Sequence, residues 1–441
     1  MTDLRRTATT SWGRVARASS HVAEPAHLDE LARAFRSEGG AALAHGLGRS
    51  YGDVCLNHGG RLVRTGRLDR IIAADWSTGV VRAEAGLTIG GLLSVAVPRG
   101  WFVPVTPGTK FVTLGGAVAN DVHGKNHHGA GTFGCHLRAV GLLRSDGETI
   151  EIGPGTRPHL FGATVGGLGL TGLIAWVELQ LQPVASSEFE VETVRLPDLD
   201  GFFRVATDSH DWPYTVAWVD CLAAGRRLGR GLFSRGRHAA EGPLLPHTEA
   251  ARLTVPRDAP AALLGPATVR LFNAAYSRQP ATGETRRVPY GKFLYPLDGI
   301  TDWNKLYGGR GFFQHQSVVP MAEAPRALQK LLELTSSEGQ GSFLVVLKLF
   351  GPRPSPGILS FPREGATFAL DLPNRGPATL RLLDRMAEVV LKAGGRLYPA
   401  KDATMTAEQF RAGFPRWREV ESYRDPAVSS DFWRRVTGDP A

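Results

Sequence analysis

The stretch AHGLGRSYGD, residues 44–53, carries most of the information about the fold of this chain. Its three glycines surround one Arg and one Tyr, and closely spaced glycines let several backbone N–H groups converge on an anion. The stretch lacks the Gly-Lys-Ser/Thr ending of a P-loop, which excludes that kind of nucleotide site. We interpret it as a loop whose bare backbone approaches a pyrophosphate closely.

A second glycine-rich region, TPGTKFVTLGGAVANDVHGKNHHGAGTFG, covers residues 106–134. It has the same character as the first loop at greater length. Two such loops can clasp one extended ligand from both sides, so we expect them to line a single site.

A third glycine segment, GGLGLTG at residues 166–172, satisfies the spacing G-x-G-x-x-G, and Glu192 follows about twenty residues later, as in a dinucleotide-binding Rossmann fold. That fold requires a helix directly after the glycines. The residues that follow, LIAWVELQLQ (173–182), alternate with period two and predict a strand. The match is therefore a coincidence, and we expect no nicotinamide site here.

Composition indicates a folded protein without a membrane span. The chain has 441 residues, which suggests two domains, and its 42% apolar and 21% charged residues lie close to globular averages. No window is apolar enough for a transmembrane helix, and the N-terminus lacks the apolar core of a signal peptide. Three scattered cysteines (Cys55, Cys135 and Cys221) do not form a disulfide framework, so we expect a cytoplasmic protein.

The net charge of +9 favours anionic partners without selecting among them. The densest basic run, Arg226 to His238, is either a contact for phosphate, nucleic acid or lipid headgroups, or a solvated Gly-rich loop. We favour the loop. The sequence carries no nucleic-acid module signature, so a nucleic-acid binder remains a minor alternative and we expect no such partner.

The predicted elements indicate an α+β fold. Short strands, a hairpin at RSDGETIEI (144–152) and helices within 24–40 and 88–100 precede residue 184. Longer strands then alternate with helices at 324–337 and 377–395, which predicts an antiparallel sheet. Residues 239–290 have weak periodicity and suggest a flexible loop or lid. Helices are expected at 406–414 and 429–438.

Together, the three glycine blocks and the later motifs KLFG (348–351) and GGRLYPAKD (394–402) resemble the decaprenylphosphoryl-β-D-ribose 2′-oxidase family. This family belongs to the vanillyl-alcohol-oxidase/PCMH-type FAD-binding flavoproteins. The resemblance runs nearly end to end and thins at 239–290. It implies a two-subdomain FAD-binding domain, residues 1–184 and 396–441, with an inserted substrate-binding domain, residues 185–395, built on an antiparallel sheet.

The resemblance also assigns the cofactor. Many relatives carry a His in the first glycine loop that bonds covalently to the flavin, and Arg49 stands at that position here, so we expect non-covalent FAD. The residues that match cofactor contacts are Gly46, Leu47, Gly48, Arg49, Ser50, Tyr51, Gly108, Thr113, Gly115, Gly116, His123, Gly124, Asn126, Ile174 and Tyr398.

Three residues match catalytic positions: Lys401 as the base or the group that binds the hydroxyl, His123 for orientation, and Tyr51 for support near the flavin ring. His123 has two alternatives, a packing residue or, with His127 and His128, a zinc ligand; the segment is broken by glycines and offers no clear further ligand, so we expect no metal. Lys401 alternatively is an ordinary surface lysine. The residues that match substrate-pocket positions are Lys125, Trp218, Gln314, Gln316, Lys348 and Phe350.

Three positions depart from the family pattern. Ala369 replaces a pocket cysteine, Thr367 replaces a neighbouring Asn, and Leu168 replaces another Asn. Flavin chemistry does not need the cysteine, but covalent inhibitors that target it should fail here, and the substrate pocket is expected to differ in detail.

The resemblance implies an FAD-dependent oxidation of a secondary sugar hydroxyl, the ribose 2′-OH of decaprenylphosphoryl-ribose, to a 2′-keto sugar. A separate NAD(P)-dependent reductase would complete the epimerisation to arabinose for cell-wall arabinan. The lipid-linked substrate suggests peripheral contact with the inner face of the membrane. The alternatives are a tailoring oxidase of a sugar or cyclitol in natural-product biosynthesis and a flavoprotein that binds a lipid-linked sugar without turnover.

Overall fold

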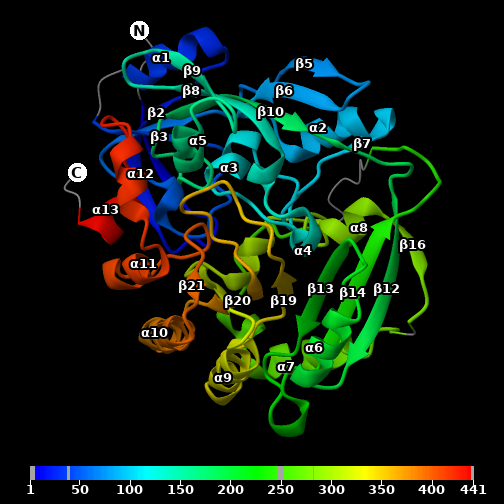
Figure 1. Cartoon of the computed structure of the whole chain (residues 1–441). Helices are drawn as coiled ribbons and strands as arrows, with labels where there is room; N and C mark the ends of the chain where they lie inside the picture. The colour runs from blue at the N-terminus through cyan, green and yellow to red at the C-terminus, as the bar shows by residue number, and fades with distance from the viewer. Residues whose placement is uncertain (1–4, 37–39, 247–252, 282, 439–441) are drawn as a thin grey trace.

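The computed structural model describes residues 5–36, 40–246, 253–281 and 283–438. Its helices and strands follow the α+β pattern, and the arrangement is shown in Figure 1. The helices are α1 (Leu28–Arg36), α2 (Ile89–Ala96), α3 (Leu114–Ala119), α4 (His127–Ala130), α5 (Pro158–Thr164), α6 (Leu199–Thr207), α7 (Pro266–Tyr276), α8 (Tyr290–Leu294), α9 (Ala324–Ser337), α10 (Pro377–Lys392), α11 (Ala407–Gly413), α12 (Trp417–Tyr423) and α13 (Asp431–Thr437).

The first 184 residues form two small sheets. The first sheet mixes parallel and antiparallel pairs and has the order β1 (Arg5–Thr10), β2 (Arg17–Ala23), β4 (Arg61–Arg64), β3 (Ala42–His45). The second sheet is antiparallel and has the order β5 (Ile71–Asp75), β6 (Val80–Glu84), β10 (Leu173–Gln180), β8 (Leu137–Leu143), β9 (Thr149–Ile152). In the same part of the chain, the two-residue strand β7 (Trp101–Phe102) pairs with β11 (Gln182–Pro183). Later in the chain, the two-residue strand β15 (Leu253–Thr254) pairs with β17 (Ile300–Thr301).

Two local predictions in this part are confirmed. The hairpin at 144–152 forms between β8 and β9, because Gly147 adopts a φ of 93° that a tight turn requires. The segment after Gly172 is strand β10 rather than a helix, so the G-x-G-x-x-G spacing does not belong to a Rossmann fold.

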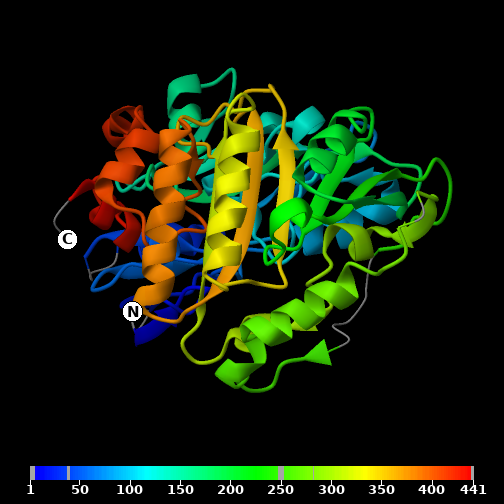
Figure 2. The same ribbon diagram turned by 90° about the horizontal axis from the view of Figure 1, so that it is seen from below.

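The chain after residue 185 forms an eight-stranded sheet in which every pair is antiparallel, as predicted. Helices α6, α9 and α10 lie on one face, and Figure 2 shows α9 and α10 in front of the strands. The order is β16 (Arg286–Pro289), β12 (Glu188–Leu196), β14 (Gly231–His238), β13 (Tyr214–Val219), β19 (Val345–Phe350), β20 (Gly365–Pro373), β18 (Phe312–Val319), β21 (Arg396–Leu397).

The basic run from Arg226 to His238 is not a solvated loop, and this prediction is wrong from residue 231 onward. Those residues form β14, which is paired on both sides. Arg235 forms an ion pair of 2.7 Å with Glu192, and Arg237 one of 3.0 Å with Glu190. Cross-strand acids thus balance these charges, which weakens the alternative of a phosphate or nucleic-acid contact.

Residues 239–290 are also more regular than weak periodicity suggested. The loop interpretation is wrong for residues 266–276, which form α7, while residues 247–252 and 282 lie outside the described residues. Phe272 and Tyr276 of this helix stack on each other, and Tyr276 also contacts Trp218 with ring centroids 4.6 Å apart. Aromatic packing therefore anchors α7 where its apolar periodicity is poor.

The last part of the chain returns from the large sheet to the first one. Strand β21 pairs with β18. Helix α12, which the sequence did not suggest, joins the two expected helices α11 and α13, and the amide of Ser429 donates to the carbonyl of Ala42 (3.1 Å). In the part of the chain that is described, no helix is long and apolar enough to cross a bilayer.

Candidate active site

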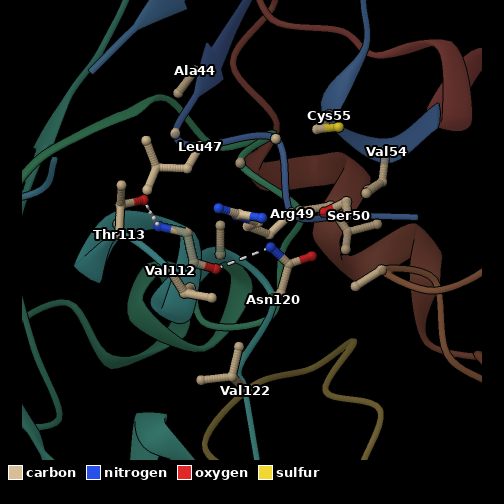
Figure 3. A pocket seen from close by; sticks show the side chains of 18 of the residues that line it. Ala44, Leu47, Arg49, Ser50, Val54, Cys55, Val112, Thr113, Asn120 and Val122 are labelled. Atoms are coloured by element: carbon tan, nitrogen blue, oxygen red, sulfur yellow. Dashed lines mark hydrogen bonds between the residues drawn. The ribbon is translucent and has the colours of Figure 1, made fainter. Parts of the chain in front are cut away.

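Two adjoining cavities lie where the sheets meet. The first has a volume of about 180 Å³ and lies between the two glycine-rich loops. Figure 3 shows the side chains of Leu47, Arg49 and Ser50 on one side of it and those of Thr113 and Asn120 on the other. The wall is completed by Leu168, Gly169, Gly172 and Ile174 and by Tyr398, Ala400 and Lys401. The two loops expected to clasp one ligand therefore enclose a common space.

Backbone contacts hold the first loop in place. The amide of Trp12 donates to the carbonyl of Ser50 (2.8 Å), and the amide of Tyr51 donates to the carbonyl of Ala400 (3.0 Å). A Cβ at Gly52 would lie 1.7 Å from the carbonyl oxygen of Asp402, which no side chain permits. Glycine at this position lets the first loop dock directly on residues 398–402.

A helix cap shapes the second loop. Thr113 precedes α3, and its hydroxyl accepts a hydrogen bond from the amide of Gly116 (3.2 Å). The side-chain amide of Asn120 donates to the carbonyl of Gly116 (2.9 Å). A Cβ at Gly46 would lie 2.5 Å from the Thr113 hydroxyl, so the two loops touch only because that residue is glycine.

The cavity wall fits a dinucleotide. Nε of Arg49, Oδ1 of Asn120 and Nδ1 of His123 are buried and make no hydrogen bond within the protein. Buried polar groups without partners are costly, so a donor and acceptor set of this kind favours a polar ligand. The backbone of the two glycine-rich loops can approach a ligand closely beside these polar atoms, which suits the pyrophosphate of FAD. Arg49 would contribute a positive charge next to that pyrophosphate. The guanidinium of Arg49 also lies 4.1 Å from the ring centroid of Trp12.

The second cavity has a volume of about 420 Å³ and lies on the face of the large sheet opposite α9 and α10. Strand register explains its floor. Gln316 lies opposite Ala369, and Lys348 lies opposite Thr367. Side chains two residues apart on a strand point to the same face, so β18, β19 and β20 all project into this cavity. Five residues line both cavities: Arg49, Thr109, His123, Gln316 and Lys401.

Three partly buried lysines, Lys125, Lys348 and Lys401, line the second cavity. Burial lowers the pKa of Lys401 to about 8, although the negative charge of Asp371 opposes this effect. Burial also lowers the pKa of Lys348 to about 7 and that of Lys125 to about 8. Nζ of Lys401 lies 3.8 Å from the ring centroid of Tyr51. A lysine of this kind can exchange a proton near neutral pH.

His123 stands between the cavities. Its Nε2 lies 3.1 Å from the side-chain amide of Gln316, and its ring packs 4.8 Å from that of Phe350. Burial holds the pKa of His123 well below its usual value, so the imidazole is neutral. No group of three or more His, Cys, Asp or Glu side chains that could hold a metal ion occurs in the described ranges.

Most residues that match family site positions line one of the cavities. The residues that line only the first cavity are Gly46, Leu47, Gly48, Ser50, Thr113, Gly115, Gly116, Ile174 and Tyr398. The residues that line only the second cavity are Tyr51, Gly108, Lys125, Gln314 and Lys348. Four residues line neither cavity: Gly124, Asn126, Trp218 and Phe350.

These four residues lie behind the walls. The side-chain amide of Asn126 donates to the carbonyl of Pro104 (2.7 Å), and the indole N–H of Trp218 donates to the carbonyl of Phe343 (3.0 Å). The carbonyl of Gly124 accepts from Lys348 (3.4 Å), and Phe350 packs against His123. Gly124 and Phe350 therefore contact wall residues directly, whereas the bonds of Asn126 and Trp218 go to Pro104 and Phe343, which line neither cavity.

Sequence reasoning missed several wall residues. Asn120 falls within the second glycine region, yet nothing in its spacing singled it out. Gly169 and Gly172 line the first cavity, so the segment 166–172 belongs to the site even though it is not a Rossmann fingerprint. Asp371 is buried beside Gln314, to which it is hydrogen-bonded. The residues at the three departures also lie here: Leu168 lines the first cavity, and Thr367 and Ala369 line the second.

Comparison with known proteins agrees with this site. Residues 19–153 match the family model described as an FAD binding domain. The chain is 36% identical to the decaprenylphosphoryl-β-D-ribose oxidase of Mycolicibacterium smegmatis over 96% of both proteins. It is 35% identical to an uncharacterised Streptomyces coelicolor protein (79% of this chain, all of that protein) and 28% identical to a Streptomyces alditol oxidase (40% of this chain, 42% of that protein). The chain binds FAD and belongs to the decaprenylphosphoryl-β-D-ribose oxidase family.

Proposed function

We propose that this enzyme oxidises the ribose 2′-hydroxyl of decaprenylphosphoryl-ribose to the 2′-keto sugar, as the oxidative half of an epimerisation to arabinose. The observation that carries the proposal is the position of Lys401, which lines both the glycine-walled cavity and the lysine-rich cavity. A proton acceptor at this junction can reach a substrate whose carbon faces the cofactor.

The chain's residues divide the chemistry as follows. Bound FAD would supply the hydride acceptor for the sugar carbon. Lys401, with its pKa lowered to about 8, takes the hydroxyl proton at Nζ. Neutral His123 orients the hydroxyl, and the ring of Tyr51 supports the ammonium that forms on Lys401.

The second cavity would hold the phosphorylated sugar. Lys125 and Lys348 provide positive charge for the phosphate, and Gln314 and Gln316 provide hydrogen bonds for the sugar hydroxyls. In this proposal the remaining predicted residues, Trp218 and Phe350, act by supporting the pocket. The other residues predicted to bind the cofactor keep that role at the first cavity.

The domain division also belongs to the proposal. Residues 1–184 and 396–441 would form an FAD-binding domain of two subdomains, and residues 185–395 an inserted substrate-binding domain. Docking of the first loop on Ala400 supports the assignment of both outer segments to one unit. Arg49 supports non-covalent attachment, because guanidinium cannot take the place of a flavin-linking His.

Two partners complete the proposal: an NAD(P)-dependent reductase that reduces the 2′-keto sugar, and a membrane surface on the cytoplasmic side that supplies the lipid-linked substrate. Exposed apolar side chains near the second cavity support the membrane contact. Leu271 on α7 is 73% exposed, and Leu253 on β15 is 65% exposed. Strand β15 pairs with β17, whose residues Ile300 and Thr301 line the cavity.

A second candidate is a tailoring oxidase acting on another sugar or cyclitol. The specific observation in its favour is that Ala369 and Thr367, two of the departures from the family pattern, both line the second cavity. A smaller apolar side chain at 369 changes the shape of the space that the sugar would occupy.

An anaerobic substrate screen tests these candidates. The holoenzyme is mixed with polyprenylphosphoryl-ribose, free pentoses or cyclitols, and bleaching of the flavin absorbance is followed, with the product mass measured. Loss of two hydrogens from polyprenylphosphoryl-ribose is the expected result. Bleaching only by a free sugar or cyclitol would favour the tailoring oxidase, and tight binding without bleaching would show a flavoprotein that does not turn over.

A further inference from the structure

Asp371 lies behind the second cavity and has no role in the function proposed above. It is fully buried on β20, directly opposite Gln314 of β18. The side-chain amide of Gln314 donates a hydrogen bond to one carboxylate oxygen, and the hydroxyl of Tyr307 lies 3.4 Å from the other. The hydroxyl of Tyr307 also lies 3.1 Å from that of Ser342. A carboxylate held so firmly inside the protein has a fixed position relative to its neighbours.

Lys401 lies on another element, the segment that packs against β18 beside Gln316. The amide of Tyr398 donates to the carbonyl of Gln316, which sets the segment 398–401 against β18 (2.9 Å). Lys401 and Gln314 then line the same cavity, and Gln314 is the direct neighbour of Asp371. Asp371 therefore lies one side chain away from the wall that carries Lys401.

The other ionisable groups around Lys401 do not offer it a negative charge. Tyr51 lies under the ammonium, and burial raises the pKa of its phenol well above the usual value, so it stays neutral. His123 is neutral, and Lys348 is a cation when charged.

The remaining carboxylates nearby act on other cations. Asp402, next in the chain, pairs with Arg435 (3.3 Å). Asp302 pairs with Lys305 (2.8 Å). Asp298 lines the same cavity, but its charge raises the pKa of Lys125 rather than that of Lys401.

We propose that Asp371 is a positioning residue that supplies the buried negative charge by which Lys401 holds a proton. The proposal deepens the function given above and rests on the role of Lys401 in it. When the sugar is oxidised, its O–H bond breaks, the proton forms an N–H bond on Lys401, and the hydride from the carbon passes to FAD. Asp371 stabilises the resulting ammonium without touching the substrate.

The electrostatics agree with this geometry. Burial raises the pKa of Asp371 to about 7, and the carboxylate in turn raises the pKa of Lys401 against the effect of burial. Removal of this charge leaves an ammonium in a buried site without compensation, so the pKa of Lys401 falls below about 8. Lys401 would then be neutral at lower pH but a weaker base.

The substitution Asp371→Asn removes the negative charge but keeps the hydrogen bonds, because an amide of the same shape can still bond to Gln314 and Tyr307. The test is competitive acetylation of the holoenzyme with acetic anhydride across pH 5 to 10, in which mass spectrometry measures the reactivity of each lysine. We expect the half-maximal reactivity of Lys401 to move at least one pH unit lower, with that of Lys125 unmoved.

Asp298→Asn is the matched control. It removes another carboxylate of the same cavity. We expect it to lower the pH of half-maximal reactivity of Lys125 and to leave that of Lys401 unchanged. Asp371→Glu keeps the charge and should leave the Lys401 profile near that of the parent protein. If Asp371→Asn fails to fold, Asp371→Ser provides a second neutral variant.

An unchanged Lys401 profile in a folded, FAD-loaded neutral variant would overturn the proposal, as would an equal shift caused by Asp298→Asn. The acetylation needs no substrate, so it separates this inference from the proposed function. If no sugar bleaches the flavin but the profile of Lys401 still moves, the proposed function fails while the charge coupling stands.

Discussion

The two cavities are built in different ways. The first has several glycines in its wall, and glycines at positions 46 and 52 let the first loop approach Thr113 and Asp402 closely. The second is walled by side chains that project from three neighbouring strands. The first cavity depends on the absence of side chains and the second on their identity. Substitutions at the glycines of the first cavity should therefore prevent the loops from docking on each other. Substitutions in the second cavity should change substrate affinity or the rate of turnover gradually.

Lys401 belongs to both cavities, so its replacement should have the largest effect. Lys401→Met removes the proton acceptor, and we expect kcat to fall by about 10²- to 10⁴-fold while FAD stays bound. In the parent enzyme the rate should rise as pH increases through about 8, where Lys401 loses its proton. Rapid-mixing measurements of flavin bleaching against pH check both points. A variant that kept the rise near pH 8 would show that another group is the base.

Gly52→Ala tests the first cavity. The added Cβ would overlap the carbonyl oxygen of Asp402, so the first loop must move away from residues 398–402. We expect a loss of about 3 kcal/mol in the free energy of unfolding and a colourless protein after purification. Gly155→Ala is the control, because a Cβ there meets nothing within 4 Å. Denaturant unfolding and the visible spectrum provide the measurements, and a yellow Gly52→Ala protein of normal stability would contradict the account.

Lys348→Met tests the second cavity. Loss of one cation should raise KM for a phosphorylated substrate about tenfold with little change in FAD content. The pKa of Lys348 is lowered to about 7, so KM of the parent enzyme should rise as pH increases through 7, where the cation is lost. That rise should vanish in the variant. The exposed Lys392 on α10 is the control position, and equal effects of Lys392→Met would sink the assignment.

Leu271→Glu should have the smallest effect and concerns the surface beside the second cavity. Loss of an exposed apolar side chain is expected to weaken binding to phosphatidylglycerol vesicles about fivefold, with turnover of a soluble substrate analogue unchanged. Leu380, 40% exposed on α10, offers the matched variant Leu380→Glu. Vesicle sedimentation measures both, and equal losses from the two variants would place the membrane contact elsewhere.

The difference between the cavities also explains what could be predicted from the sequence. Glycine loops are contiguous, so the spacing of glycines within residues 46–53 and 106–134 was enough to indicate that the two loops line one cavity. Regular elements with clear signals were found equally well. Helix α9 spans the predicted residues 324–337, and Asp-Gly marked the hairpin at 144–152.

The remaining features depend on contacts between distant segments. Asp371 is one polar residue in an apolar strand, and only its register opposite Gln314 shows its place behind the cavity. The arginines of β14 resembled a solvated run because their acidic partners lie on another strand, β12. Helix α7 is held by aromatic contacts rather than by its own periodicity. In each case tertiary packing decides what local pattern cannot.

The contact between Gly52 and Asp402 has a consequence for how the protein matures. The first cavity takes one wall from residues near position 50 and another from residues near position 400, so synthesis must pass residue 400 before this cavity can form. Flavin therefore cannot serve as an early template for the nascent polypeptide. A flavin bound between these walls would enter after the C-terminal segment has been synthesised.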